Sequence, residues 1–117
     1  MQRKSPKLLE DVRDAADYIL SVTVGETQNS LAGNRMLRQA VERNFEIIGE
    51  AMKRLAHIDS DTARLIGDYP QIIAFRNLLI HGYEHIDVAM VWHVIQHGLP
   101  TLLHKAETLL RKSDQDP

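Results

Sequence analysis

The stretch SLAGNRMLRQAVERNFEIIGEAMKRLA, residues 30–56, decides the fold of this chain. Its large apolar residues recur at steps of three and four positions, which gathers them on one side of a long helix. These residues are Leu37, Val41, Phe45, Ile48, Met52 and Leu55. Gly49 lies in the same helix without a side chain, and we expect a neighbouring helix to approach closely at that point. Residues 30–56 therefore predict a central helix that packs along its neighbours.

Two segments on either side of this helix show the same period. Apolar residues from Pro6 to Val22 predict a first helix, and the proline suits its first turn. After the central helix, Asp59 or Ser60 caps a short helix that ends near Gly67.

Two further helices complete the prediction. One covers residues 71–81 and stops at Gly82, because glycine tolerates the conformation that often ends a helix. The last begins after the N-cap Asp87, and Gly98 and Pro100 kink or break it. The alternation typical of strands is absent from the sequence. We expect an all-α fold: an up-and-down four-helix bundle with an additional short helix and a kinked last helix.

The composition limits the class of protein. With 117 residues, 44% of them hydrophobic, the chain suits one helical domain over residues 1–117, with an ordered core at about 6–112. The lack of cysteine excludes disulfides, thiolate catalysis and cysteine-based zinc sites. A net charge of −2 argues against a protein that coats duplex DNA. No apolar run is typical of a signal peptide or a membrane span, so we expect a cytoplasmic protein without a membrane partner.

The segment FRNLLIHGY, residues 75–83, holds the residues that can carry chemistry. Arg76 presents a planar, permanently charged group suited to a phosphate, and His81 can exchange a proton near neutral pH. Because they are five positions apart, these two side chains point about 140° away from each other on an ideal helix. Asn77, four positions before His81, shares its face. Either the helix end distorts at Gly82, or two chains bring both groups to one phosphate across a dimer cleft.

The pattern Arg76, four residues, His81, one residue, Tyr83 resembles the signature of the HepT-like ribonucleases of the HEPN superfamily. Two flanking blocks add to the likeness. One is ERNFEIIGEA, residues 42–51, and the other is the first part of the last helix, residues 86–100. The resemblance covers most of the chain, and together the blocks are more specific than the motif alone.

This resemblance implies a metal-independent endoribonuclease that acts as the toxin of a toxin–antitoxin pair and works as a homodimer. Arg76 and His81 would then be catalytic and Asn77 would bind substrate, with no metal or other cofactor. The implied partner is a minimal nucleotidyltransferase, the antitoxin, which silences the toxin by attaching adenylyl groups to Tyr83.

The residue types fit this chemistry on their own. A ribonuclease needs no serine, cysteine or acidic cluster if the 2′-hydroxyl of the RNA is the nucleophile. His81 would act as general base or acid, and Arg76 would stabilise the charge that develops on phosphorus. The expected product carries a 2′,3′-cyclic phosphate, and DNA, which lacks the 2′-hydroxyl, should not be cut.

Each residue of the motif also has a structural interpretation. Arg76 can pair with Glu50 or Glu46, His81 can stabilise a helix C-terminus, and Tyr83 can pack in the core. Two alternative functions therefore stay open. One is a non-catalytic module that holds a nucleotide or RNA for a nucleotidyltransferase partner, and the other is a helical adaptor.

Two other groups of residues lie outside the motif. Three basic residues form either an RNA-facing patch or scattered solvated charge: Arg35, Arg38 and Arg43. Three histidines would share one face of an unbroken last helix, but no carboxylate set completes a metal site there: His93, His97 and His104.

Overall fold

A computed structural model of the protein describes residues 1–81 and 87–115, and every regular element in these ranges is helical. The elements in chain order are α1 (Ser5–Val22), α2 (Gln28–Ala32), α3 (Arg35–Ile58), α4 (Ser60–Ile66), α5 (Tyr69–His81), α6 (Val88–His93), the π-helical turn η1 (Val94–Gly98) and α7 (Leu99–Gln115). The predicted all-α bundle is confirmed. No helix in the described ranges is long and apolar enough to cross a membrane.

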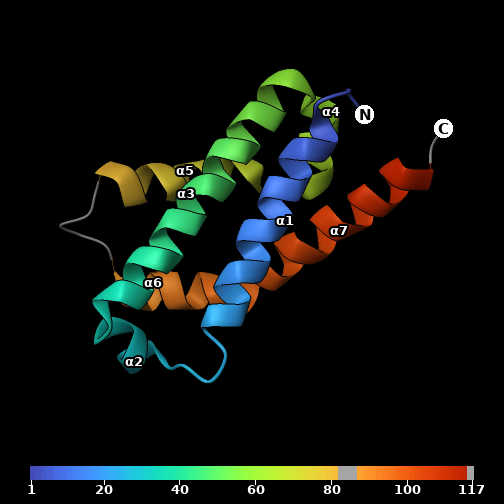
Figure 1. The fold of residues 1–117 in the computed structure, drawn as a ribbon. Helices are drawn as coiled ribbons and strands as arrows, with labels where there is room; N and C mark the ends of the chain where they lie inside the picture. The colour runs from blue at the N-terminus through green and yellow to red at the C-terminus, as the bar shows by residue number, and fades with distance from the viewer. Residues whose placement is uncertain (82–86, 116–117) are drawn as a thin grey trace.

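The central helix of the prediction, α3, is the centre of the fold. It packs against α1, and α1 in turn packs against α7, while α5 crosses α3 (Figure 1). Val41, Met52 and Leu55 of the predicted apolar stripe are completely buried in this core. α1 contributes side chains such as Leu9 and Val12, which are equally inaccessible to solvent. The stripe thus provides the packing surface that its period predicts.

The central helix begins at Arg35 and not at Ser30, because two N-caps divide residues 28–58 into α2 and α3. The side chain of Thr27 accepts a hydrogen bond from the Ser30 N–H, and the Ser30 hydroxyl accepts one from the Thr27 N–H. Asn34 then caps α3, because its side-chain oxygen accepts a hydrogen bond from the Leu37 N–H three residues later. The fold therefore has two short helices, α2 and α4, where the sequence predicted one.

The last helix is kinked, as predicted, and Figure 1 shows α6 and α7 running in different directions. The bend coincides with η1, in which the Leu99 N–H donates to the Val94 carbonyl, five residues back. Pro100 lacks an N–H, and in a regular α-helix its ring clashes with the carbonyl four residues earlier. The wider π turn accommodates the proline without breaking the helix.

Asp59 ties the start of the chain to the corner between α3 and α4. Its Oδ2 accepts hydrogen bonds from the Gln2 N–H at 2.9 Å and from the hydroxyls of Ser5 and Thr62, both at 2.7 Å. Its Oδ1 accepts one from the Thr62 N–H at 3.2 Å. Burial acts to raise the pKa of the Asp59 carboxyl, but these hydrogen bonds outweigh it and hold the pKa well below its usual value.

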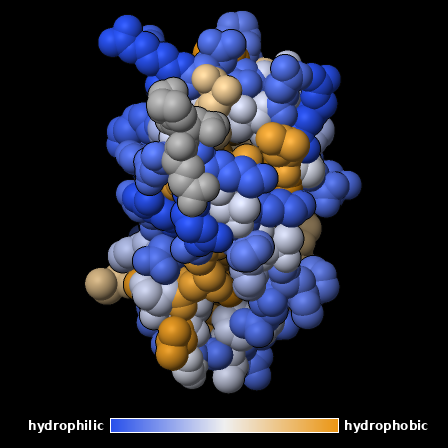
Figure 2. Space-filling model, turned by 90° about the vertical axis from the view of Figure 1, so that its right-hand side faces the viewer, coloured by the Kyte–Doolittle hydropathy of each residue, from blue (hydrophilic) through white to orange (hydrophobic). Residues whose placement is uncertain are grey.

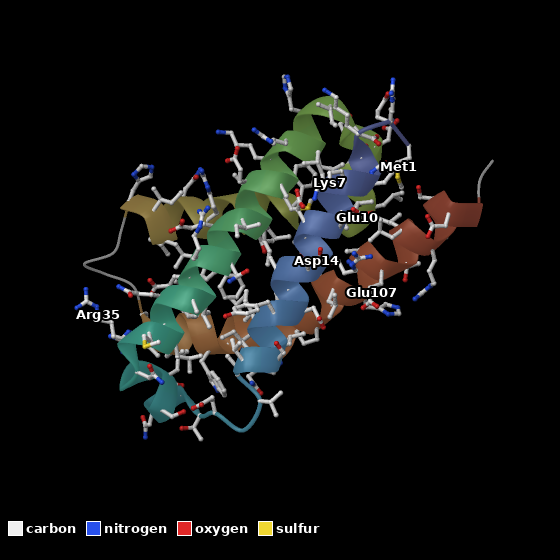
Figure 3. The ribbon with its side chains drawn as sticks, viewed as in Figure 1. Met1, Lys7, Glu10, Asp14, Arg35 and Glu107 are labelled. Carbon is white, nitrogen blue, oxygen red and sulfur yellow. The ribbon has the colours of Figure 1, made fainter. Side chains whose placement is uncertain are left out.

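The side of the molecule seen in Figure 2 has an ordinary solvated surface, covered mainly by hydrophilic residues. Figure 3 shows three acidic side chains, Glu10 and Asp14 of α1 and Glu107 of α7, near the contact between these two helices. The surface of α5 differs because it is more apolar.

Candidate active site

Apolar residues occur on every side of α5, but little of that helix is buried. Its large apolar residues are Ile72, Ile73, Phe75, Leu78, Leu79 and Ile80. Of these only Leu79 is fully buried, and Leu78 is 38% exposed. A helix that is apolar all round is normally enclosed by protein. In the single chain, α5 therefore presents apolar surface that further contacts could cover.

Part of this surface faces a groove of about 700 Å³ between α5 and the α6–α7 segment. Phe75 and Leu78 line the groove from α5, and Met90, Val94 and Leu102 line it from the opposite side. The groove follows from the topology, because α5 packs mainly on α3 and leaves its other side open.

Two contacts fix α5 on α3. The rings of Phe45 and Phe75 meet edge to face, with their centroids 5.1 Å apart. At Gly49, a Cβ atom would lie only 2.1 Å from the Cβ of Arg76, so the stem of Arg76 rests directly on the α3 backbone. The prediction that a neighbouring helix approaches closely at Gly49 is confirmed.

The guanidinium of Arg76 is held by two partners. Its Nη2 donates to Glu50 Oε2 at 3.1 Å, and its Nη1 donates to Asn77 Oδ1 at 3.0 Å. Of the two acids that the sequence offered, Glu50 is the partner, whereas Glu46 pairs with Arg43 at 3.2 Å. The ion pair predicted by the structural interpretation of Arg76 therefore exists.

This pairing leaves Arg76 within reach of solvent. The side chain is 21% exposed, and its buried Nε has no hydrogen-bond partner among the described residues. Arginine has five N–H donors, and the two bonds above use two of them. The site can still donate to an incoming anion.

His81 is the last residue of α5 and is exposed. Because α5 remains α-helical up to this residue, Arg76 and His81 stay about 140° apart around the helix axis. Any distortion at Gly82 lies outside the described residues, as does Tyr83. Asn77 is exposed and shares the His81 side of the helix. Its carbonyl oxygen accepts a hydrogen bond from Arg76, so its amide nitrogen is the atom that can still donate.

The basic residues at the start of α3 do not form one patch. Arg38 donates to the carbonyls of Leu31 and Ala32, Arg43 is paired with Glu46, and Arg35 points away from the molecule (Figure 3). This arrangement matches scattered solvated charge, the second of the two interpretations that the sequence allowed.

The histidines of the last helix lie at its bend. The rings of His93 and His97 are tilted by 42° with their centroids 4.4 Å apart. The described part of the chain contains no group of three or more side chains placed to hold a metal ion.

The sequence analysis did not identify one residue that contacts the partner of Arg76. Arg54 lies 3.5 Å from the second oxygen of Glu50, so this carboxylate sits between two guanidinium groups. The four-residue spacing of Glu50 and Arg54 on one helix is a signal that could have revealed the pair.

The sequence of the chain is similar to that of a known protein family and its members. The model of a family described as ribonuclease HepT-like matches residues 12–109. A predicted RNase of Methanocaldococcus jannaschii is 30% identical over 91% of this chain and 96% of its own length. A probable ribonuclease HepT of Thermococcus cleftensis is 32% identical over 93% of this chain and 98% of its own. No solved structure matches the chain.

Proposed function

The chain belongs to the ribonuclease HepT-like family, and on this premise we propose that it is a metal-independent endoribonuclease that acts as a dimeric toxin. The observation that carries the proposal is the arrangement on α5: a braced Arg76 with free N–H donors, and an exposed His81 one and a half turns further on. An arginine and a histidine are sufficient for RNA cleavage when the substrate supplies its own nucleophile.

The reaction proceeds in one displacement. His81 removes the proton from the 2′-hydroxyl, and the 2′-oxygen attacks the adjacent phosphorus while the N–H groups of Arg76 stabilise the added negative charge. The bond from phosphorus to the 5′-oxygen breaks, and His81, which now carries the proton from the 2′-hydroxyl, donates a proton to that leaving oxygen. The products are a 2′,3′-cyclic phosphate and a free 5′-hydroxyl.

Two chains are needed to assemble this site. Within one regular helix, Arg76 and His81 point in directions too different to meet at one phosphate. A dimer that pairs the α5 helices would bring Arg76 of one protomer near His81 of its partner. The apolar residues of α5 support this arrangement, since the single chain buries only Leu79 among them.

Cleavage of a labelled single-stranded RNA in the presence of EDTA tests the proposal. We expect wild type to cut RNA but not the same sequence as DNA, and His81→Ala to be slower by about a hundredfold or more. The helical circular dichroism of the variant should match that of wild type. Full activity of His81→Ala in a nuclease-free preparation would contradict the catalytic role.

A mixing experiment tests the shared site. Arg76→Ala and His81→Ala chains are each inactive alone, but a heterodimer of the two has one site with both residues intact if each site draws on both protomers. Co-expression should therefore restore part of the activity. If the mixture stays as inactive as its components, the two residues act within one chain.

We further propose that a nucleotidyltransferase partner silences the enzyme by transferring AMP from ATP to the Tyr83 hydroxyl, with release of pyrophosphate. Tyr83 follows His81 by two positions, and the added bulk and negative charge would exclude RNA from the motif. Tyr83→Phe should remain active in the presence of the partner, whereas Tyr18→Phe, which alters an exposed tyrosine of α1, should be silenced like wild type. Continued silencing of Tyr83→Phe by modification would exclude Tyr83 as the target.

We propose that the toxin and its nucleotidyltransferase partner act in the cytoplasm, where the RNA substrates are.

One observation favours a second candidate function. In the single chain Arg76 is paired with an acid, as expected for a helical adaptor whose motif serves only packing and capping. Intact RNA in the cleavage test and no binding of mononucleotides by unmodified wild type would establish this adaptor instead. Tight mononucleotide binding together with intact RNA would establish the non-catalytic module that holds a nucleotide or RNA for its partner.

A further inference from the structure

We infer that Glu50 is a positioning residue for Arg76, which fixes the guanidinium in the orientation that the transition state requires. The inference rests on the proposed ribonuclease function and extends it to a residue of α3. The first observation is the hydrogen bond from Arg76 Nη2 to Glu50 Oε2, at 3.1 Å. It joins two residues that are 26 positions apart in the sequence.

The arginine is held at both ends. At its stem, Arg76 lies against Gly49, which has no side chain. The Cβ and Cγ of Arg76 are only 2.1 and 2.4 Å from the position that a Cβ on residue 49 would take. At its head, the carboxylate of the next residue, Glu50, accepts a hydrogen bond. Adjacent residues of one helix therefore restrict a side chain that is normally free to rotate.

The donors that remain match a phosphate. Glu50 takes one N–H from Nη2, Asn77 takes one from Nη1, and Nε is buried. Of the five donors of an arginine, one on each Nη is then not used by these bonds, in a side chain that is 21% exposed. A phosphate can accept hydrogen bonds from both Nη groups of one arginine in a bidentate contact. Glu50 thus leaves one donor on each Nη for such a contact.

The environment of Glu50 argues against a role in stability. Its side chain is 45% exposed, and its second oxygen lies 3.5 Å from Nε of Arg54, which is 69% exposed. Ion pairs with this much solvent contribute little to folding. Removal of Glu50 should therefore affect the rate of the reaction more than the stability of the fold.

The test compares Glu50→Ala and Glu50→Gln with Glu46→Ala, a matched control one helical turn away whose carboxylate pairs with Arg43 and not with Arg76. Two quantities are measured: the single-turnover cleavage rate at saturating RNA, and the Kd for an RNA made uncleavable by a 2′-deoxy nucleotide. We expect Glu50→Ala to lower the rate about ten- to a hundredfold, as a misplaced catalytic group does, and to change Kd less than about threefold.

Glu50→Gln should recover most of the rate because it keeps a hydrogen-bond acceptor for Nη2, and Glu46→Ala should match wild type. Equal rates for wild type and Glu50→Ala would overturn the inference, as would a loss confined to Kd or a glutamine variant no better than alanine.

A second measurement does not depend on activity. In ¹⁵N NMR spectra of the arginine side chains, assigned with Arg76→Lys, the Nη2 group of Arg76 should rotate slowly in wild type and in Glu50→Gln and faster in Glu50→Ala, which removes its partner. If wild type cleaves no RNA, the proposed function fails, and these spectra still decide whether Glu50 holds Arg76. Unchanged rotation in Glu50→Ala would overturn the inference even if wild type is active.

Discussion

α3 and α5 are both rich in large apolar residues, yet they differ in how much of that surface the chain covers. α3 places Val41, Met52 and Leu55 completely out of contact with solvent, whereas α5 fully buries only Leu79 and leaves Leu78 38% exposed. Helices that carry function often belong to the less tightly packed part of a fold. The difference teaches that the chain itself covers most of the apolar stripe of α3, and that it leaves more of the apolar surface of α5 open to further contacts.

Truncation of one leucine in each helix tests the difference between α3 and α5 most directly. Leu55→Ala should destabilise the protein by about 2–5 kcal/mol, because it leaves a cavity in a closed core. Leu78→Ala should cost less than about 1 kcal/mol at low protein concentration, because its side chain is already partly solvated. Urea unfolding followed by circular dichroism measures both values.

In the proposed dimer the cost of Leu78→Ala should grow with protein concentration, since association stabilises the folded state by mass action. Equal costs for the two variants at every concentration would remove the distinction between the two helices.

A second prediction concerns the point where the two regions touch. Gly49→Ala should destabilise the fold by about 1–3 kcal/mol, because the new Cβ would overlap the stem of Arg76 and push α5 away from α3. Gly98→Ala is the matched control: its Cβ would meet only Val94, at 4.0 Å. That variant should be more stable than wild type by about 0.5–1 kcal/mol, through the loss of backbone freedom in the unfolded chain.

Thermal unfolding of both glycine variants measures the difference, and RNA cleavage by Gly49→Ala should fall along with its stability. A Gly49→Ala protein as stable and active as wild type would show that α5 does not depend on this close contact.

The smallest effect is expected at the corner between α3 and α4. Asp59→Asn should cost about 1 kcal/mol at pH 7, because an amide cannot accept all the hydrogen bonds that the carboxylate receives from Gln2, Ser5 and Thr62. Asp61→Asn, at an exposed position two residues later, should cost almost nothing.

The pH dependence of this effect has a definite sign. Since folding lowers the pKa of Asp59, its stabilisation is complete above the unfolded pKa of about 3.9 and is lost as the pH falls further. The difference in unfolding free energy between wild type and Asp59→Asn should therefore shrink in acid. A difference that stays constant down to about pH 2 would contradict this account.

Some helices were predictable from the signals at their ends. The cap at Asp59 or Ser60 indicated the short helix, and Gly82 indicated the end of residues 71–81. The structure starts both helices within two residues of the prediction. The division between α2 and α3 was missed although both of its signals are local: Gly33 is a typical helix end and Asn34 is a good N-cap. The π turn was also beyond prediction, since a kink and a break before Pro100 have the same local signal.

The candidate site was predictable as a set of residue types but not as an arrangement. The sequence identified Arg76, Asn77 and His81, and it offered both Glu50 and Glu46 as partners for the arginine. Choosing between these acids requires the crossing of α5 over α3, which is a tertiary property that no local spacing contains. For the same reason the sequence could mark Gly49 as a place of close approach without saying which side chain would lie there.

The π turn before α7 has a consequence for how insertions and deletions act on this protein. A π turn holds one residue more than the same length of α-helix, so it takes up an extra residue without turning the chain that follows. Deletion of one residue within Val94–Gly98 should therefore restore a regular α-helix and leave the buried Leu102 and Ala106 facing the same core. A deletion within α7 itself, where each residue turns the chain by about 100°, would instead move every later residue out of phase with that core.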